Sequence, residues 1–106
     1  MMDLTGIKET IREKPAVGLY FSAPTCNVCH ALKPKLFEAL QTNFSELELI
    51  SIDISEDQAV AANYNVFAIP TLVVFLDGRE FIRKTRHMSV DAVVREIERP
   101  YKIMFT

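Results

Sequence analysis

Cys26 and Cys29 are the only cysteines of the sequence, and two residues separate them. A thiolate can attack a disulfide, and a second thiol close by can then release the mixed disulfide that forms. A disulfide across so short a loop constrains the unfolded chain very little, so the pair is a poor structural staple. The spacing therefore indicates thiol–disulfide exchange.

The surrounding residues place this pair where a strand gives way to a helix. Residues 16–21 form an apolar run, residues 22–25 interrupt it, and apolar side chains then recur every four residues from Val28. Residues three apart lie on one face of a helix, so the two sulfurs can meet. Free N–H groups and the helix dipole stabilise a thiolate there, and such cysteines have pKa values of about 3.5–7.5. We therefore predict that Cys26 is the more exposed nucleophile and Cys29 the buried resolving thiol.

The elements that must position this pair follow from the apolar periodicity and the turn residues. Ser55 has capping-box spacing to Gln58, Asp77-Gly78 is a hairpin signal, and Ser89 is suited to cap the last helix. The first half reads as a βαβ unit with a parallel pair, and the second ends in an antiparallel unit. We predict an α/β fold whose central mixed sheet of four strands has helices on both faces. The predicted ranges are a helix before Pro15, a strand over 16–21, a helix over 26–44, a strand over 47–54, a helix that opens with the capping box at 55–58 and reaches about 64, strands over 71–76 and 79–86, and a helix from 90.

Length and charge narrow the class of protein further. The chain has 106 residues and a formal net charge of -2, which suits one domain over residues 1–106 and argues against a nucleic-acid binder or a polybasic membrane anchor. Residues 1–14 carry several charges, so they do not form the apolar core of a signal peptide. The uncharged runs 15–32 and 58–76 contain proline and polar residues, so neither predicts a membrane span. We expect a cytoplasmic protein with no nucleic-acid or membrane partner.

With these elements in order, the sequence resembles the thioredoxin superfamily over nearly the whole chain. Beyond Cys26 and Cys29, Pro34 falls five residues after the second cysteine, where thioredoxins kink their active-site helix. The segment Ile69-Pro70-Thr71 resembles the cis-proline element of the family, and the Asp77-Gly78 hairpin follows at similar spacing. The resemblance implies a thioredoxin-like fold in a single domain.

The resemblance also implies what the protein does. It suggests a thiol–disulfide oxidoreductase that reduces protein disulfides, with a thioredoxin reductase or a small thiol as electron donor, no bound cofactor or metal, and a monomeric state. Ile69 would bind the substrate backbone, and Pro70 would shape the groove. The residues expected to contact substrate are Asn27, Val28, Ile69, Pro70 and Arg86.

Three departures from thioredoxin accompany this resemblance. The active-site segment is Cys26-Asn-Val-Cys29, and the chain has no tryptophan. By spacing, the buried aspartate of thioredoxin corresponds to Tyr20 and its lysine partner to about Ile50. A glycine that lines the family's groove corresponds to Arg86, which is bulky and charged. We predict that Tyr20 packs in the core with its hydroxyl bonded locally.

Other functions for the same residues are a haem site, a zinc site and a binding module. Cys26-Asn-Val-Cys29-His30 matches the covalent haem pattern, for which Met88 or Met104 would be an axial ligand. Structural zinc needs four ligands, whereas only His30 and His87 accompany the two thiols. A protein that keeps the fold but only binds a partner is the remaining alternative.

Two further segments have more than one interpretation. Residues 100–106 are apolar for a chain end, so they either pack back on the domain or contact a partner or second copy. The basic residues of the last strand either line the groove or form a solvated edge that discourages aggregation. They are Arg79, Arg83, Lys84 and Arg86.

Overall fold

The computed structural model describes residues 3–105 and contains every predicted helix and strand. Met1, Met2 and Thr106, at the ends of the predicted domain, lie outside the described residues. The boundaries of the elements lie within a few residues of the predicted ones. For the last helix only the start was predicted, and this helix extends to Met104. The elements are α1 (Leu4–Glu13), β1 (Ala16–Ser22), α2 (Asn27–Asn43), β2 (Leu47–Asp53), α3 (Gln58–Asn63), β3 (Thr71–Leu76), β4 (Arg79–Thr85) and α4 (Val90–Met104).

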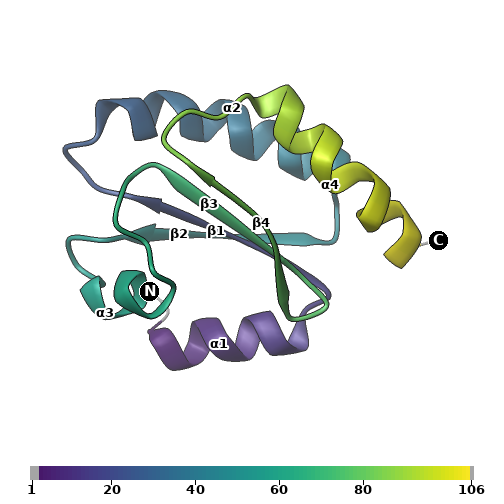
Figure 1. Ribbon diagram of the computed structural model, residues 1–106, viewed down its shortest axis with the longest axis horizontal. Coiled ribbons are helices and arrows are strands. Elements are labelled where there is room, and N and C mark those ends of the chain that lie inside the picture. The colour runs from purple at the N-terminus through teal and green to yellow at the C-terminus, as the bar shows by residue number, and fades with distance from the viewer. Residues whose placement is uncertain (1–2, 106) are drawn as a thin grey trace.

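The four strands form one mixed sheet in the order β2-β1-β3-β4 (Figure 1). β1 runs parallel to β2 and antiparallel to β3, and β3 runs antiparallel to β4. The turn between β3 and β4 has positive φ angles at Asp77 (53°) and Gly78 (77°), as a two-residue hairpin requires. The predicted mixed sheet is therefore confirmed.

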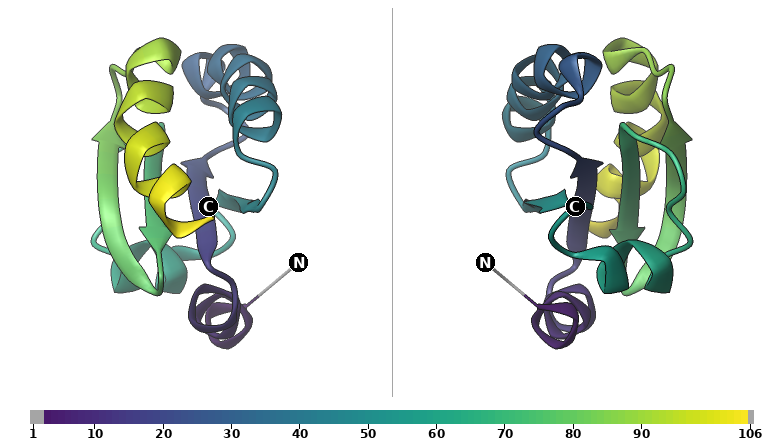
Figure 2. Two further views of the ribbon diagram at one scale, coloured as in Figure 1. Left: turned by 90° about the vertical axis from the view of Figure 1, so that its right-hand side faces the viewer. Right: turned by 90° about the vertical axis from the view of Figure 1, so that its left-hand side faces the viewer.

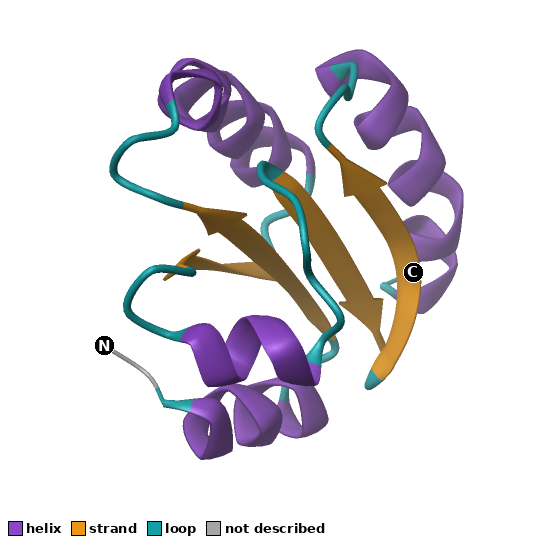
Figure 3. Ribbon diagram, turned by 60° about the vertical axis from the view of Figure 1, so that its left-hand side comes forward, coloured by secondary structure: helices purple, strands orange, loops and turns teal. Residues whose placement is uncertain are grey.

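Helices cover both faces of the sheet, as predicted. α2 and α4 lie over one face and α1 and α3 over the other, which the end-on views of Figure 2 and the side view of Figure 3 show. Successive residues of a strand point to opposite faces. Tyr20 of β1 therefore packs in the core under α2 and α4, whereas Leu19 and Phe21 pack against α1 and α3.

Strand register brings three distant segments to one edge of this sheet. Phe21 near the end of β1 pairs with Thr71 at the start of β3, and Thr71 pairs with Thr85 at the end of β4. The segment after β1, the segment before β3 and the segment after β4 therefore meet at this edge. They carry the cysteine pair, Pro70 and Arg86, respectively.

One local prediction is wrong. Ser55 does not cap α3, which begins at Gln58 after Asp57 and has no side-chain cap. The backbone N–H and hydroxyl of Ser55 instead donate to Oδ1 of Asp53, at 2.9 and 2.6 Å. These bonds hold the pKa of the Asp53 carboxyl below its ordinary value. An ionised carboxylate at the strand end thus competes with the helix for Ser55.

The apolar segment at the end of the chain belongs to the last helix. α4 continues through Pro100 to Met104. Tyr101 is buried and packs edge-to-face on Phe44, with ring centroids 4.8 Å apart. Its hydroxyl accepts a hydrogen bond of 2.8 Å from the backbone N–H of Glu46. Tyr101 therefore packs this segment back onto the domain, which was one of the two alternatives.

Candidate active site

The cysteine pair lies at the start of α2, and a disulfide joins the two sulfurs, with the Cα atoms 5.3 Å apart. Cys26 is the N-cap of α2, and its Sγ accepts a hydrogen bond of 3.2 Å from the backbone N–H of Cys29. Cys26 is partly exposed, whereas Cys29 is fully buried. This difference in exposure is the one the sequence predicts for a nucleophile and a resolving thiol.

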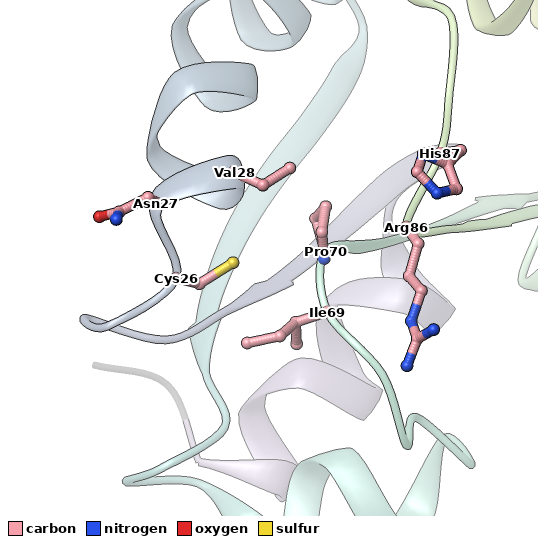
Figure 4. Close-up of a pocket in the computed structure, with 7 residues that line it drawn as sticks. All are labelled: Cys26, Asn27, Val28, Ile69, Pro70, Arg86 and His87. Atoms are coloured by element: carbon pink, nitrogen blue, oxygen red, sulfur yellow. The ribbon is translucent and has the colours of Figure 1, made fainter.

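A hollow of about 360 Å³ opens beside Cys26. Cys26 and Val28 form one side of it and the segment at Ile69 and Pro70 faces them, while Arg86 lies beyond Pro70 (Figure 4). The structure thus brings all the predicted substrate-contacting residues together and adds His87, which the sequence did not indicate. The lining residues are Cys26, Asn27, Val28, Ile69, Pro70, Arg86 and His87.

Backbone conformation fixes the wall of the hollow opposite Cys26, which Ile69, Pro70 and Arg86 form. The Ile69–Pro70 peptide bond is cis, as the resemblance implied. Arg86 has a φ of 64°, and its N–H donates a hydrogen bond of 2.6 Å to the carbonyl of Pro70. Pro70 has no N–H, so it presents no amide donor to the sulfur. The wall is apolar at Pro70 and cationic beyond it.

Tyr20 supports the cysteine pair from inside the core. Its hydroxyl donates a hydrogen bond of 2.8 Å to the carbonyl of Cys29, and its ring packs edge-to-face on Phe37. Burial raises the pKa of Tyr20, so the hydroxyl stays protonated at neutral pH and acts as a donor. The prediction of a core tyrosine with a locally bonded hydroxyl is therefore confirmed.

We expect Tyr20→Phe to lower the free energy of unfolding by about 1 kcal/mol, the net value of one hydrogen bond. Above pH 10 this difference should shrink. The unfolded chain releases the tyrosine proton near pH 10, whereas the raised pKa keeps the proton in the folded chain, so the wild type loses stability as pH rises. Urea unfolding at pH 7 and pH 10.5 measures both effects. A difference between the two proteins that grows with pH would contradict the assignment.

The two histidines differ in their position, since His87 lines the hollow beside Cys26 and His30 does not. His30 lies outside the hollow, and its Nε2 is 2.9 Å from the carbonyl of Pro24. Over residues 3–105 there is no group of three His, Cys, Asp or Glu side chains placed to hold a metal ion. Both sulfurs are engaged in the disulfide with each other, whereas the haem pattern needs each of them bonded to a haem. The geometry therefore favours a dithiol–disulfide site.

None of the helices within residues 3–105 has the length and apolar character needed to cross a membrane.

The fold and this site define a dithiol–disulfide protein built on the thioredoxin fold. A family model described as Thioredoxin matches residues 5–99, so the chain belongs to the thioredoxin family. The cysteine pair at the start of α2 makes it a thiol–disulfide oxidoreductase.

Similar proteins agree with this placement in sequence and in structure. The thioredoxin-like protein YdfQ of Bacillus subtilis is 32% identical over 94% of this chain and 88% of its own length. A thioredoxin of Chlamydia trachomatis is also 32% identical, over 87% of this chain and 92% of its own length. The structure of a thioredoxin mutant from Halobacterium salinarum has a TM-score of 0.78 at 29% identity and covers 92% of this chain and 83% of that one. The structure of Fasciola hepatica thioredoxin has a TM-score of 0.75 at 29% identity and covers 95% of this chain and 99% of that one.

Proposed function

We propose that this protein reduces disulfides of other proteins by cycling Cys26 and Cys29 between dithiol and disulfide. The observation that carries the proposal is the asymmetry of the pair. The sulfur of Cys26 borders an open hollow, whereas Cys29 is fully buried and its sulfur lies within bonding distance of the Cys26 sulfur. This arrangement lets a large substrate reach the sulfur of Cys26, while the buried thiol of Cys29 remains available for the second step.

The reaction begins from the reduced pair. The Cys26 thiolate attacks one sulfur of the substrate disulfide, an S–S bond forms to Cys26, and the other substrate sulfur leaves as a thiolate that takes up a proton. The backbone N–H of Cys29 and the start of α2 already face the sulfur of Cys26, so they would stabilise its thiolate.

The second step releases the substrate. Cys29 loses its proton and attacks the sulfur of Cys26, so the bond between the two cysteines forms and the second substrate sulfur leaves and is protonated. Two electrons have passed from the protein to the substrate, and the pair is in the disulfide state that the structure shows. A thioredoxin reductase or a small-thiol donor must return two electrons before another cycle.

The groove residues have separate parts in this proposal. An extended substrate segment would lie across the hollow, its backbone at Ile69 and its sulfur at Cys26, while Asn27, Val28 and Pro70 limit its approach. The chemistry needs no bound cofactor. A pair kept as a dithiol suits a reducing compartment, so we place the protein in the cytoplasm, as a monomer without nucleic-acid or membrane partners.

Reduction of insulin disulfides with a thioredoxin reductase and its electron source supplied tests the proposal. We expect turnover that depends on the protein and on the reductase. Turnover with dithiothreitol but not with the reductase would point to a small-thiol donor. Absence of turnover with either donor would contradict the proposed function and favour a binding module.

A further inference from the structure

We infer that the groove selects disulfides flanked by an acidic side chain, and that Arg86 is the residue that recognises this acid. The inference rests on the proposed function, because it names the class of protein disulfide that the same groove accepts.

Arg86 differs from the other cations near it in having no carboxylate partner. Arg83 forms a two-pronged ion pair with Glu80, with N–O distances of 2.9 and 3.0 Å, which lowers the pKa of the Glu80 carboxyl. Lys84 pairs with Glu96 at 2.8 Å. Arg86 is exposed, and no carboxylate within residues 3–105 forms an ion pair with it. Its charge is thus available to a bound molecule.

The lining of the hollow has a cation at one end and no acid. Cys26, Val28, Ile69 and Pro70 supply sulfur and apolar surface, and the ionisable residues other than cysteine on this lining are Arg86 and His87. The chain as a whole is slightly acidic, with a net charge of -2. The positive end of the groove is therefore a local feature, and electrostatic complementarity favours a negative group there.

The backbone at Arg86 also points to a function for the side chain. With a φ of 64°, Arg86 is in the left-handed region, where a side chain costs conformational energy and glycine does not. The other non-glycine residues with positive φ within residues 3–105 are Asn65 and Asp77, types that tolerate it. An arginine at such a position, with its backbone N–H bonded to the Pro70 carbonyl in the groove wall, suggests that its side chain contributes to binding.

The geometry sets where the acid must lie. Arg86 is on the far side of Pro70 from Cys26 (Figure 4). In an extended peptide each residue advances about 3.3 Å, and side chains two apart share a face. An acid two residues from the attacked cysteine therefore projects on the same side as its sulfur and can reach past Pro70. Carboxylate to guanidinium is the pairing that arginine makes best.

Single-turnover reduction of matched peptides tests the inference. Each ten-residue peptide holds one cysteine in a mixed disulfide with 2-mercaptoethanol, and Glu, Gln or Lys stands two residues before or after that cysteine. Rates with excess reduced protein are divided by rates with dithiothreitol, which removes the effect of the neighbouring charge on intrinsic reactivity. We expect the Glu peptide to react about two- to fivefold faster than the Gln peptide, the range for a partly exposed ion pair, and the Lys peptide to react more slowly than both.

Variants assign the preference to one side chain. Arg86→Gln should remove it, Arg86→Glu should reverse it, and Arg86→Lys should keep part of it, with His87 unchanged throughout. Arg79→Gln removes the same charge from the exposed opposite end of β4 and should leave the preference intact. Circular dichroism establishes that each variant is folded, and 0.5 M salt should weaken the wild-type preference by screening.

The outcomes separate this inference from the proposed function. Equal normalised rates for all peptides with wild-type protein would overturn the acid preference while the reductase function stands. A preference that survives in Arg86→Gln would overturn the assignment to Arg86. A rate for every peptide no faster than that of a protein whose cysteines are both alkylated would instead contradict the proposed function.

Discussion

Cys26→Ser should abolish disulfide reduction, with a loss of at least about 1,000-fold, because a hydroxyl does not ionise near neutral pH and cannot form the mixed disulfide. The insulin assay measures this loss directly. The expectation follows from the placement of Cys26 at the open hollow and at the N-cap of α2, where N–H groups face its sulfur.

The fold offers a clean control for this variant. Serine is among the best N-cap residues, so Ser at position 26 can accept the bond from the Cys29 N–H that the sulfur now accepts. Thermal unfolding of the variant should therefore match that of the reduced wild type closely. Turnover in the folded variant near the wild-type rate would show that Cys26 is not the nucleophile.

Cys29→Ser should also stop turnover, but it should leave a trapped intermediate. Cys26 can still attack the substrate, and the buried second thiol that would release it is missing. One substrate molecule per protein should accumulate as a mixed disulfide on Cys26. Mass spectrometry under non-reducing conditions measures the adduct, and a reducing agent should remove it.

The matched control is Cys26→Ser, in which the exposed cysteine and not the buried one is replaced. Cys26→Ser leaves only the fully buried thiol of Cys29, so it should trap little or no substrate. Iodoacetamide should likewise modify reduced wild-type protein first at Cys26. Faster alkylation of Cys29, or equal trapping by both variants, would reverse the assigned roles. Neither outcome would change the family to which the chain belongs.

Short-range features could be predicted from the residues because their causes are local. Spacing placed the cysteines three apart at a helix start, and the Asp77-Gly78 pair marked the turn that the positive φ angles confirm. The same local reasoning was wrong where two local structures competed. Ser55 bonds to Asp53 instead of capping α3.

By itself, the sequence determined the cysteine pair and the strand and helix that hold it, since each depends on neighbours within a few residues, whereas Pro70 as the counterpart of the pair followed from the resemblance to the thioredoxin superfamily. Only the tertiary structure shows how these distant segments come together in one groove, and that His87 joins them. The pairing of Phe21 with Thr71 and of Thr71 with Thr85 brings Arg86 and His87 to the cysteine edge. Strand register depends on the packing of whole faces. For the same reason, only the fold shows that Arg83 and Lys84 have acidic partners, whereas Arg86 is left facing the groove without one.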